Sequence, residues 1–325
     1  MSKPVVIVSP REKFSCAEQS LRSLYAETKV DFYLVYIEAS GQEAHRQTLR
    51  QLQREFGFEL IILEKFLYPN AARNLGLERA KRYAPDWVAF VDNDVLFAEG
   101  WLGELLRVGT EKQAGAVTPL ICQNHVDFRE VHTAGGVCRI ENGALVEVLV
   151  SQGQAAAEIS PEPVTTQLIE FHCVLLRYTP KLKCDPKLLN TREHIDLSLQ
   201  LQARGESIYL APRARVAYLP PTLETFRELL SYELRWSNVH KQKSLEHFAR
   251  KWNVTFESAN PRNLNAPRRQ KVLSALETQL SPYVPDWLTA WPLLMHAEPQ
   301  VNRFLGLLCT DFYDPEYVIL EEYGS

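Results

Sequence analysis

The clearest structural signal in the chain is the stretch WVAFVDND, residues 87–94, in which five apolar residues lead directly into three polar ones. An unbroken apolar run of this length is typical of a strand that helices cover on both faces, as in a parallel sheet. Asp92, Asn93 and Asp94 stand where that strand ends. Ligands of open α/β sheets bind at the carboxyl ends of the strands, so we expect these side chains to face a ligand.

Short apolar runs of the same kind precede this stretch and alternate with segments of helix-forming composition. This alternation is typical of the strands and helices of a parallel α/β sheet. We therefore predict an α/β fold with a mostly parallel, mixed sheet flanked by helices. The expected strands are residues 5–8, 32–37, 58–63 and 87–91, and the expected helices are residues 16–27, 42–56 and 70–83, the last with Asn70 as its N-cap.

The middle of the chain predicts a hairpin and further strands. Asn142 and Gly143 form a dipeptide that favours a tight turn, so the apolar runs on either side are expected to pair. Residues 151–166 show no periodicity, and we expect them to form a mobile loop. The expected strands are residues 114–119, 137–140, 145–150, 170–177 and 208–211.

The sequence predicts a mainly helical structure for the last third of the chain. Pro220 and Pro221 are expected to end the α/β part, and the amphipathic pattern of residues 223–252 predicts one or two helices. We therefore place a domain boundary near residue 222. The expected organisation is an α/β domain at residues 1–222 and a mainly helical C-terminal extension at residues 223–325.

The composition, charge and cysteine spacing of the chain argue against several classes of protein. The hydrophobic and charged fractions, 46% and 23%, are near the averages of soluble globular domains. A formal charge of −4 argues against an extended nucleic-acid surface. No apolar run is long enough to cross a bilayer, and the six cysteines form no C-x-x-C pair. We expect a cytoplasmic protein with reduced thiols and no transmembrane segment, either free or peripheral at the inner face of the membrane.

The paired carboxylates of Asp92 and Asp94 point to a cation. Two adjacent carboxylates repel each other unless a cation lies between them, and oxygen ligation suits Mg²⁺ or Mn²⁺. Such an ion would bind the phosphates of a nucleotide and stabilise charge on a diphosphate leaving group. The alternative is an Asp-rich turn that caps the following helix.

Five segments, taken in order, resemble glycosyltransferase family 2. They are VVIVSP (5–10), YIEAS (36–40), NAARNLG (70–76), WVAFVDND (87–94) and GWL (100–102), and the match of order and spacing continues to about residue 220. The resemblance implies a GT-A fold of Rossmann-like type. It also implies a polysaccharide-biosynthesis enzyme that uses Mn²⁺ or Mg²⁺. The implied reaction moves a hexose or hexosamine, with inversion, from a UDP-sugar to the hydroxyl of a glycan, lipid-linked or protein acceptor.

The resemblance also assigns residues to the donor site. It places Glu38 against the base of a uridine-type nucleotide, and Pro10 and Arg11 at the edge of the nucleotide. Arg73 and Asn74 open a helix directed at the same crevice, and helix N-termini favour phosphate. Simple surface or capping roles for Glu38, Arg11 and Asn74 remain alternatives. The expected donor set is Pro10, Arg11, Glu38, Arg73, Asn74, Asp92, Asn93 and Asp94, with Asp92 and Asp94 on the metal.

A second segment, NTREHIDLSL from residue 190, resembles the acidic helix that supplies the catalytic base of the family. His194 stands where the family usually has an Asp, so either Glu193 or His194 is the expected base. Asp196 is expected in the acceptor pocket. The structural alternative is a helix that starts with a capping box of Asn190 and Glu193 and stops at Gly205.

The chain departs from the family pattern at one more position. After the segment APRARVA, residues 211–217, the family often has a His that completes the metal site, whereas this chain has Tyr218. A phenol is a poor ligand for Mg²⁺ or Mn²⁺, so the metal would depend on Asp94 and the diphosphate. His125, His132, His172 and His240 show no ligand spacing and are expected to be structural.

Other classes remain as alternatives. Because His194 and Tyr218 depart from the family pattern, one alternative is a glycosyltransferase-fold protein that has lost catalysis and serves as a binding or scaffold module. A sugar nucleotidyltransferase or a Rossmann dehydrogenase would need a Gly-rich loop after the first strand. The segment SPREKF, residues 9–14, contains no glycine, which argues against both.

Overall fold

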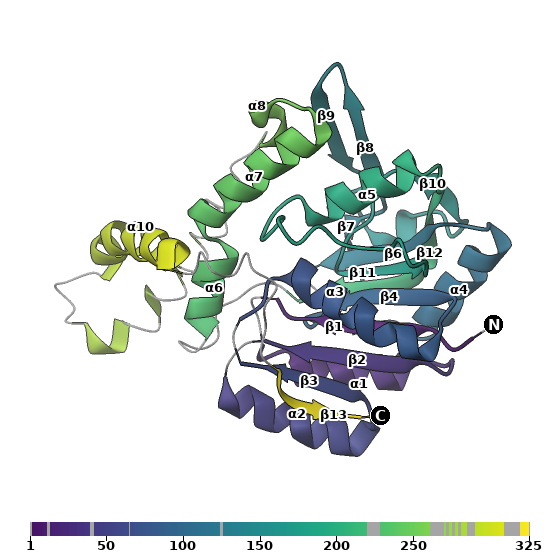
Figure 1. Cartoon of the computed structure of the whole chain (residues 1–325), viewed down its shortest axis with the longest axis horizontal. Helices are drawn as coiled ribbons and strands as arrows, with labels where there is room; N and C mark the ends of the chain where they lie inside the picture. Colours follow the sequence, from purple (N-terminus) through teal and green to yellow (C-terminus); the bar gives the residue numbers. More distant parts are fainter. Residues whose placement is uncertain are drawn as a thin grey trace.

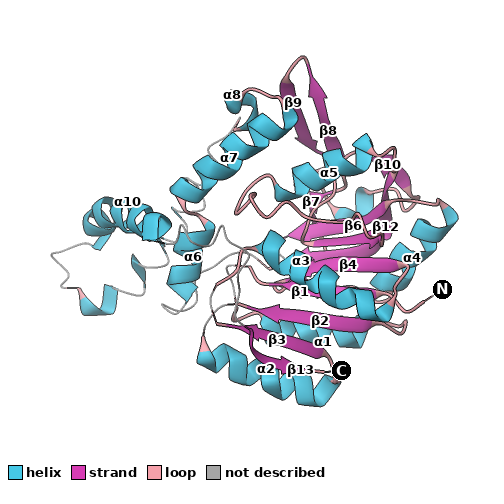
Figure 2. Ribbon diagram, in the orientation of Figure 1, coloured by secondary structure: helices cyan, strands magenta, loops and turns pink. Residues whose placement is uncertain are grey.

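The computed structural model describes most of the chain. The described residues are 2–11, 14–39, 42–64, 66–123, 126–219, 228–260, 270, 273–274, 277–278, 281–284, 290–308 and 319–324. An eleven-stranded mixed sheet runs through the molecule, with helices on both of its faces (Figures 1 and 2). The α/β fold class expected from the sequence is confirmed.

The first third of the chain forms alternating strands and helices, as predicted. The elements are β1 (Val5–Ser9), α1 (Ala17–Glu27), β2 (Tyr33–Glu38), α2 (Glu43–Phe56), β3 (Glu59–Leu63), α3 (Pro69–Ala80) and β4 (Trp87–Asp92). The four strands pair in parallel in the order β3–β2–β1–β4. The chain adds β2 and β3 on one side of β1 and then crosses back to place β4 on the other side. The crevice at the carboxyl ends of β1 and β4 is a topological switch point, where α/β sheets bind ligands.

The second part of the sheet contains an antiparallel strand next to β4. Its elements are β5 (Val95–Phe97), α4 (Trp101–Glu111), β6 (Ala116–Gln123), β7 (Glu130–Thr133), β11 (Cys173–Arg177), α5 (Glu193–Ala203) and β12 (Ile208–Tyr218). Strand β11 lies between β4 and β6 and is antiparallel to both. The start of β11 therefore lies at the carboxyl end of β4, beside Asp92.

The hairpin predicted around Asn142 and Gly143 is present as β8 (Gly136–Glu141) and β9 (Ala144–Leu149). Both turn residues have positive φ, 50° and 72°, as a tight hairpin turn requires. The prediction of an unstructured loop at residues 151–166 is wrong. That segment contains a short 3-10 helix, η2 (Ala156–Glu158), and strand β10 (Val164–Thr166), which pairs with β12 at the edge of the sheet.

Helices cover both faces of the sheet. Side chains of α1, α2 and α4 pack on one face with Val6 and Val8, whereas α3 and α5 pack on the other with Val5 and Ile7. Helix α3 lies very close to β1, because a Cβ at Gly76 would be 2.3 Å from the Cγ2 atom of Ile7. This close packing fixes the first turn of α3 against the switch point.

Two predicted helix starts are corrected. Tyr68, not Asn70, is the N-cap of α3, because a proline fits the first helical position. Arg192, with φ 68°, is the N-cap of α5, so the capping box from Asn190 does not form. Both asparagine amides instead donate to backbone carbonyls of distant segments. Gly205, with φ 71°, follows α5 as the predicted stop.

The C-terminal part is largely helical. Its elements are α6 (Leu229–Arg235), α7 (Asn238–Trp252), α8 (Phe256–Ala259), α10 (Ala290–Leu308) and β13 (Ile319–Tyr323). The helical region expected at 223–252 is divided at Ser237, whose side chain caps α7. Pro220, Pro221 and the start of that region lie outside the described residues, as does His125.

Strand β13 was not predicted. It pairs antiparallel with β3, so the end of the chain returns to the edge of the main sheet (Figure 1). Helices α6, α7 and α10 lie beyond the carboxyl ends of the central strands in the same view. None of the helices within the described ranges is both long enough and apolar enough to traverse a bilayer.

Candidate active site

Asp92, at the end of β4, is held by two arginines. Nη1 of Arg11 donates to its Oδ2 atom at 2.8 Å, and Nη2 of Arg73 donates to its Oδ1 atom at 2.9 Å. The side chain of Asp92 is 1% exposed. A buried carboxylate needs such partners, because desolvation of an unpaired charge is costly. Asp92 therefore anchors both cationic side chains at the switch point.

Arg73 is positioned by the first turn of α3. Its guanidinium lies 3.8 Å from the ring centroid of Phe171 and donates to Oδ1 of Asn70 at 3.1 Å. Burial lowers the pKa of Arg73, and the charge of Asp92 opposes that shift. The guanidinium is therefore fixed on three sides at the wall of the site.

His172 completes a group that can hold a metal ion. Oxygens of Asp92 and Asp94 and a ring nitrogen of His172 all lie within 4.8 Å of one another. Two carboxylates and an imidazole fit Mn²⁺ or Mg²⁺, with more oxygen than nitrogen in the set. The expectation that His172 has only a structural role therefore missed this group. The residue comes from the start of β11, which the antiparallel pairing brings beside β4.

Tyr218 does not replace the family's histidine as a ligand. Its ring stacks on that of His172, with centroids 4.4 Å apart and an interplanar angle of 12°. His132 packs edge-on against the same imidazole and pairs through Nδ1 with Oε1 of Gln123 at 3.0 Å. The imidazole of the site is thus supplied by β11, and the residue at the family position supports it.

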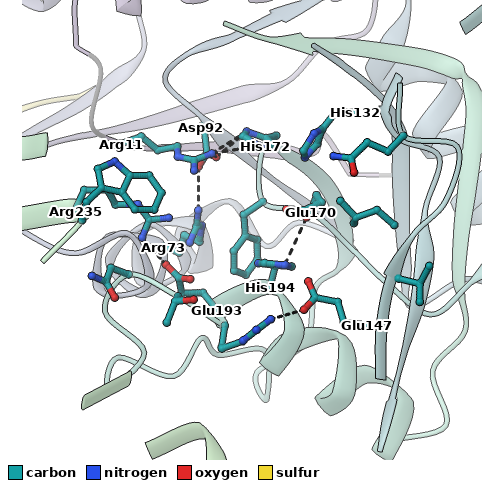
Figure 3. Close-up of a pocket in the computed structure, with 18 residues that line it drawn as sticks. Arg11, Arg73, Asp92, His132, Glu147, Glu170, His172, Glu193, His194 and Arg235 are labelled. Carbon is teal, nitrogen blue, oxygen red and sulfur yellow. Dashed lines mark hydrogen bonds and ion pairs between the residues drawn. The ribbon is translucent and has the colours of Figure 1, made fainter. Parts of the chain in front are cut away.

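A cavity of about 470 Å³ opens beside this group (Figure 3). One side carries Arg11, Arg73, Asp92 and His172, and another carries the start of α5. The remaining walls come from β9, from the segment before β11 and from α6. The lining residues are Arg11, Arg73, Asp92, His132, Glu147, Val148, Leu149, Gln152, Glu170, Phe171, His172, Asn190, Thr191, Arg192, Glu193, His194, Arg235 and Trp236.

Glu193 lies in this cavity but is committed to an ion pair. Its Oε1 atom accepts from Nη1 of Arg235 at 2.9 Å, and its side chain is 5% exposed. Burial alone would raise the pKa of Glu193, but the charge of Arg235, a backbone hydrogen bond and then the charge of Arg73 outweigh it, and the pKa is lowered. Glu193 is therefore a stable anion and a weak proton acceptor.

His194 faces a carboxylate that sequence analysis did not identify. Its Nε2 atom lies 3.5 Å from Oε1 of Glu170, and the His194 side chain is 23% exposed (Figure 3). A carboxylate behind an imidazole can orient the ring. No local pattern marks Glu170, because its partner lies on a helix that begins later in the chain.

Six of the residues expected in the site do not line the cavity, and three of these, Glu38, Asn74 and Asp196, are bonded to other parts of the molecule. The side chain of Glu38 is buried, with Oε2 3.1 Å from Nε2 of His45. The amide of Asn74 donates to the carbonyl of Cys184 and accepts from its N–H, at 2.8 and 2.9 Å. Asp196, 1% exposed, accepts from Trp252, Lys251 and Gln200 and so joins α5 to α7.

The rest of the predicted donor set surrounds Arg11. Pro10 is buried directly before it, at the end of β1. Oδ1 of Asn93 accepts from the backbone N–H of Arg11 at 3.0 Å, so the turn after β4 holds the loop after β1. Asp94 belongs to the metal-capable group. The structure thus brings Arg11, Arg73, Asp92, Asn93 and Asp94 together.

The chain is similar to known proteins in part of its sequence and in its fold. The model of the glycosyl transferase family 2 matches residues 5–141. No curated protein matches the chain. Among solved structures, a crystal structure of GalNAc-T7 with UDP, GalNAc and Mn²⁺ is similar, with a TM-score of 0.55 and 15% identity over 83% of this chain and 58% of that one. TarS of S. aureus gives a TM-score of 0.48 and 13% identity over 93% and 54%.

The structural likeness concerns the fold, because both identities are low. The chain spans a little over half of the length of these two solved structures, 58% and 54%. The family match covers β1 and β4, which form the switch point, as well as Asp92, Asp94 and the hairpin strand β8, but it ends before His172. The resemblance predicted from the sequence is confirmed over residues 5–141, which match the glycosyl transferase family 2, and the fold is of the GT-A type.

Proposed function

We propose that the protein is an inverting glycosyltransferase that moves a hexose or hexosamine from a UDP-sugar to an acceptor hydroxyl. The observation that carries this proposal is the shared cavity. Its wall joins Arg11, Arg73 and Asp92, suited to a diphosphate and its cation, to the pair of His194 and Glu170, suited to proton transfer.

At the donor end, Arg11 and Arg73 are the candidates to bind phosphate oxygens. Guanidinium groups form charge-assisted hydrogen bonds with phosphate, and they are already held at the site by Asp92. Asp92, Asp94 and His172 would hold Mn²⁺ or Mg²⁺, which when bound neutralises charge on the leaving diphosphate. GalNAc-T7 was crystallised with UDP and Mn²⁺, and this supports the choice of both.

At the acceptor end, we assign the base to His194. The acceptor oxygen attacks the anomeric carbon as the bond from that carbon to the diphosphate oxygen breaks, and the hydroxyl proton passes to the imidazole. With the Nε2 hydrogen directed at Glu170, the other ring nitrogen carries the lone pair that accepts this proton. Glu193, paired with Arg235, remains anionic throughout.

The organisation of the chain follows from this assignment. Residues 1–222 would hold the donor and the catalytic groups. Residues 223–325 would form an extension that contributes Arg235 and Trp236 to the acceptor end of the cavity and then returns, as β13, to the edge of the main sheet. The acceptor can be a glycan, a lipid-linked sugar or a protein side chain. All three present a hydroxyl to the same base.

Calorimetric titration of UDP tests the proposal, with Mn²⁺ and then with EDTA, on the wild type and on Asp94→Ala. We expect metal-dependent binding that the variant loses. UDP-hexoses and UDP-N-acetylhexosamines are then screened for slow hydrolysis, in which water serves as acceptor. Absence of binding to UDP and to other nucleoside diphosphates would refute the proposal. Binding without turnover would favour the non-catalytic alternative.

A further inference from the structure

Arg11 contacts two of the three members of the metal-capable group. Its Nη1 atom lies 2.8 Å from Oδ2 of Asp92 and 2.8 Å from Nδ1 of His172. The close-up shows the guanidinium directed at both side chains (Figure 3). One nitrogen of Arg11 is thus placed between a carboxylate oxygen and an imidazole nitrogen of the set that also includes Asp94.

This placement puts Arg11 in competition with a metal ion. A divalent ion binds carboxylate oxygen and imidazole nitrogen through the lone pairs that accept the Arg11 hydrogen bonds. Each lone pair serves one partner at a time, and two cations at such short range repel each other. Arg11 must therefore leave Asp92 and His172 before an ion can use both.

Arg73 differs from Arg11 in this respect. It donates to the other carboxylate oxygen of Asp92, and Phe171 and Asn70 hold its guanidinium in place. The side chain of Arg11 is 11% exposed, against 3% for Arg73. The guanidinium of Arg11 therefore takes the position that a metal ion would occupy, whereas that of Arg73 is held in place as part of the wall of the site.

We propose that in the free protein the guanidinium of Arg11 occupies the position of the metal ion and thereby weakens metal binding. A diphosphate then strengthens metal binding, because it gives Arg11 another anionic partner. The first half depends only on the contacts of Arg11. The second half rests on the proposed function, because it requires that the protein bind a nucleoside diphosphate.

The first half is tested by Mn²⁺ binding to the full chain without nucleotide, followed by electron paramagnetic resonance. We expect Arg11→Met to bind Mn²⁺ at least about tenfold more tightly than the wild type, since each of the two hydrogen bonds that Arg11 donates to the set is worth about that factor. Arg11→Lys, which keeps the charge, should show a smaller gain. Adding Asp94→Asn to Arg11→Met should remove the gain if the ion binds in this group.

A matched control is Arg235→Met, which removes the same charge from the same cavity and leaves Arg11 on Asp92 and His172. Thermal unfolding shows whether each variant folds. If Arg11→Met does not fold, Arg11→Gln is used in its place. An unchanged or weaker Mn²⁺ affinity in the folded Arg11 variants overturns the proposal. An equal gain in Arg235→Met also overturns it, because general cavity charge would then explain the effect.

The second half is tested by repeating the titration with saturating UDP. We expect UDP to raise the Mn²⁺ affinity of the wild type by a larger factor than that of Arg11→Met, since coupling between sites reflects the equilibrium that both ligands shift. Equal factors would overturn this half. Failure of UDP to bind at all would refute the proposed function, while the nucleotide-free comparison would still decide the role of Arg11.

Discussion

The two ends of the active-site cavity are built in different ways. The donor end is formed by the ends of β1, β4 and β11, which are neighbours in one hydrogen-bonded sheet. There Asp92 and Arg73 are 1% and 3% exposed and bonded to each other. The acceptor end is formed by the start of α5, by the segment before β11 and by α6, and His194 is 23% exposed.

The donor end is therefore fixed by one sheet, whereas the acceptor end is assembled from several separate segments. Adjacent strands fix the spacing of the donor groups through the backbone pairing of the sheet, such as Ser9 with Asp92. At the acceptor end, Arg192 reaches Glu147 on β9 and Arg235 reaches Glu193 on α5, across long stretches of chain. Such contacts can be changed one at a time without disturbing the sheet. We therefore expect chemistry and stability to respond differently to substitutions at the two ends.

The largest effect is expected on the rate of turnover when the base is removed. His194→Ala should lower the rate of UDP release from a UDP-sugar by about 100- to 10,000-fold, the usual contribution of a positioned base. UDP affinity should change little, because His194 lies across the cavity from Asp92. Single-turnover measurements on His194→Ala and Glu193→Gln decide between the two bases. A larger loss in Glu193→Gln would contradict the assignment.

The next largest effect is expected on stability at the donor end. Asp92→Ala leaves two arginines without their shared carboxylate and should lower the free energy of unfolding by about 3–5 kcal/mol. UDP binding should also be lost. Glu147→Ala is the matched control at the acceptor end, where Glu147 pairs with Arg192 and is 21% exposed, and should cost about 1–2 kcal/mol. Equal losses in urea unfolding would show that the two ends do not differ in rigidity.

The donor end was largely predictable from the sequence because its signals are local. A continuous apolar strand followed by DND places three polar residues at a strand end, and the order of strands and helices locates the switch point. His172 was missed because no spacing in the sequence relates it to Asp92. It reaches the site because the antiparallel strand β11, which comes much later in the sequence, pairs with β4.

The acceptor end was less predictable because its contacts are tertiary. The segment EHIDL marked Glu193 and His194, but nothing local indicates that Glu170 faces His194 or that Asp196 joins α5 to α7. The edge strand β13 escaped prediction for a related reason. Its residues alternate between half-buried and exposed, and a partly solvated edge strand carries a weak apolar pattern.

An intermediate effect is expected from acid on the helices behind the acceptor end. His240 on α7 contacts Tyr68 beside α3, and its Nε2 atom donates to the carbonyl oxygen of Gly306 on α10 at 2.9 Å. Burial lowers the pKa of His240 to about 4, against 6.5 in an unfolded chain. Between these values the unfolded state binds more protons, so stability falls as the pH falls from about 6.5 to 4, by about 3 kcal/mol in all.

Urea unfolding at several pH values checks this prediction, with His240→Asn as the comparison. The variant should be less stable at neutral pH because it loses the contacts to Tyr68 and Gly306. Its stability should nevertheless fall less steeply with acid over the same range, since the titrating imidazole is gone. The same slope in both proteins would show that other groups cause the acid sensitivity.

The smallest effect is expected where α7 is joined to α5. The indole N–H of Trp252 donates to Oδ1 of Asp196 at 2.8 Å, and Lys251 bonds to the same carboxylate. Trp252→Phe removes one hydrogen bond to a charged group while Lys251 keeps Asp196 paired, so we expect a loss of about 1–2 kcal/mol in the free energy of unfolding. UDP affinity should stay the same within about twofold, because the donor groups are set by the sheet. A large loss of UDP affinity in a folded Trp252→Phe protein would mean that the helices behind the acceptor end also hold the donor end, and that the two halves of the site act as one.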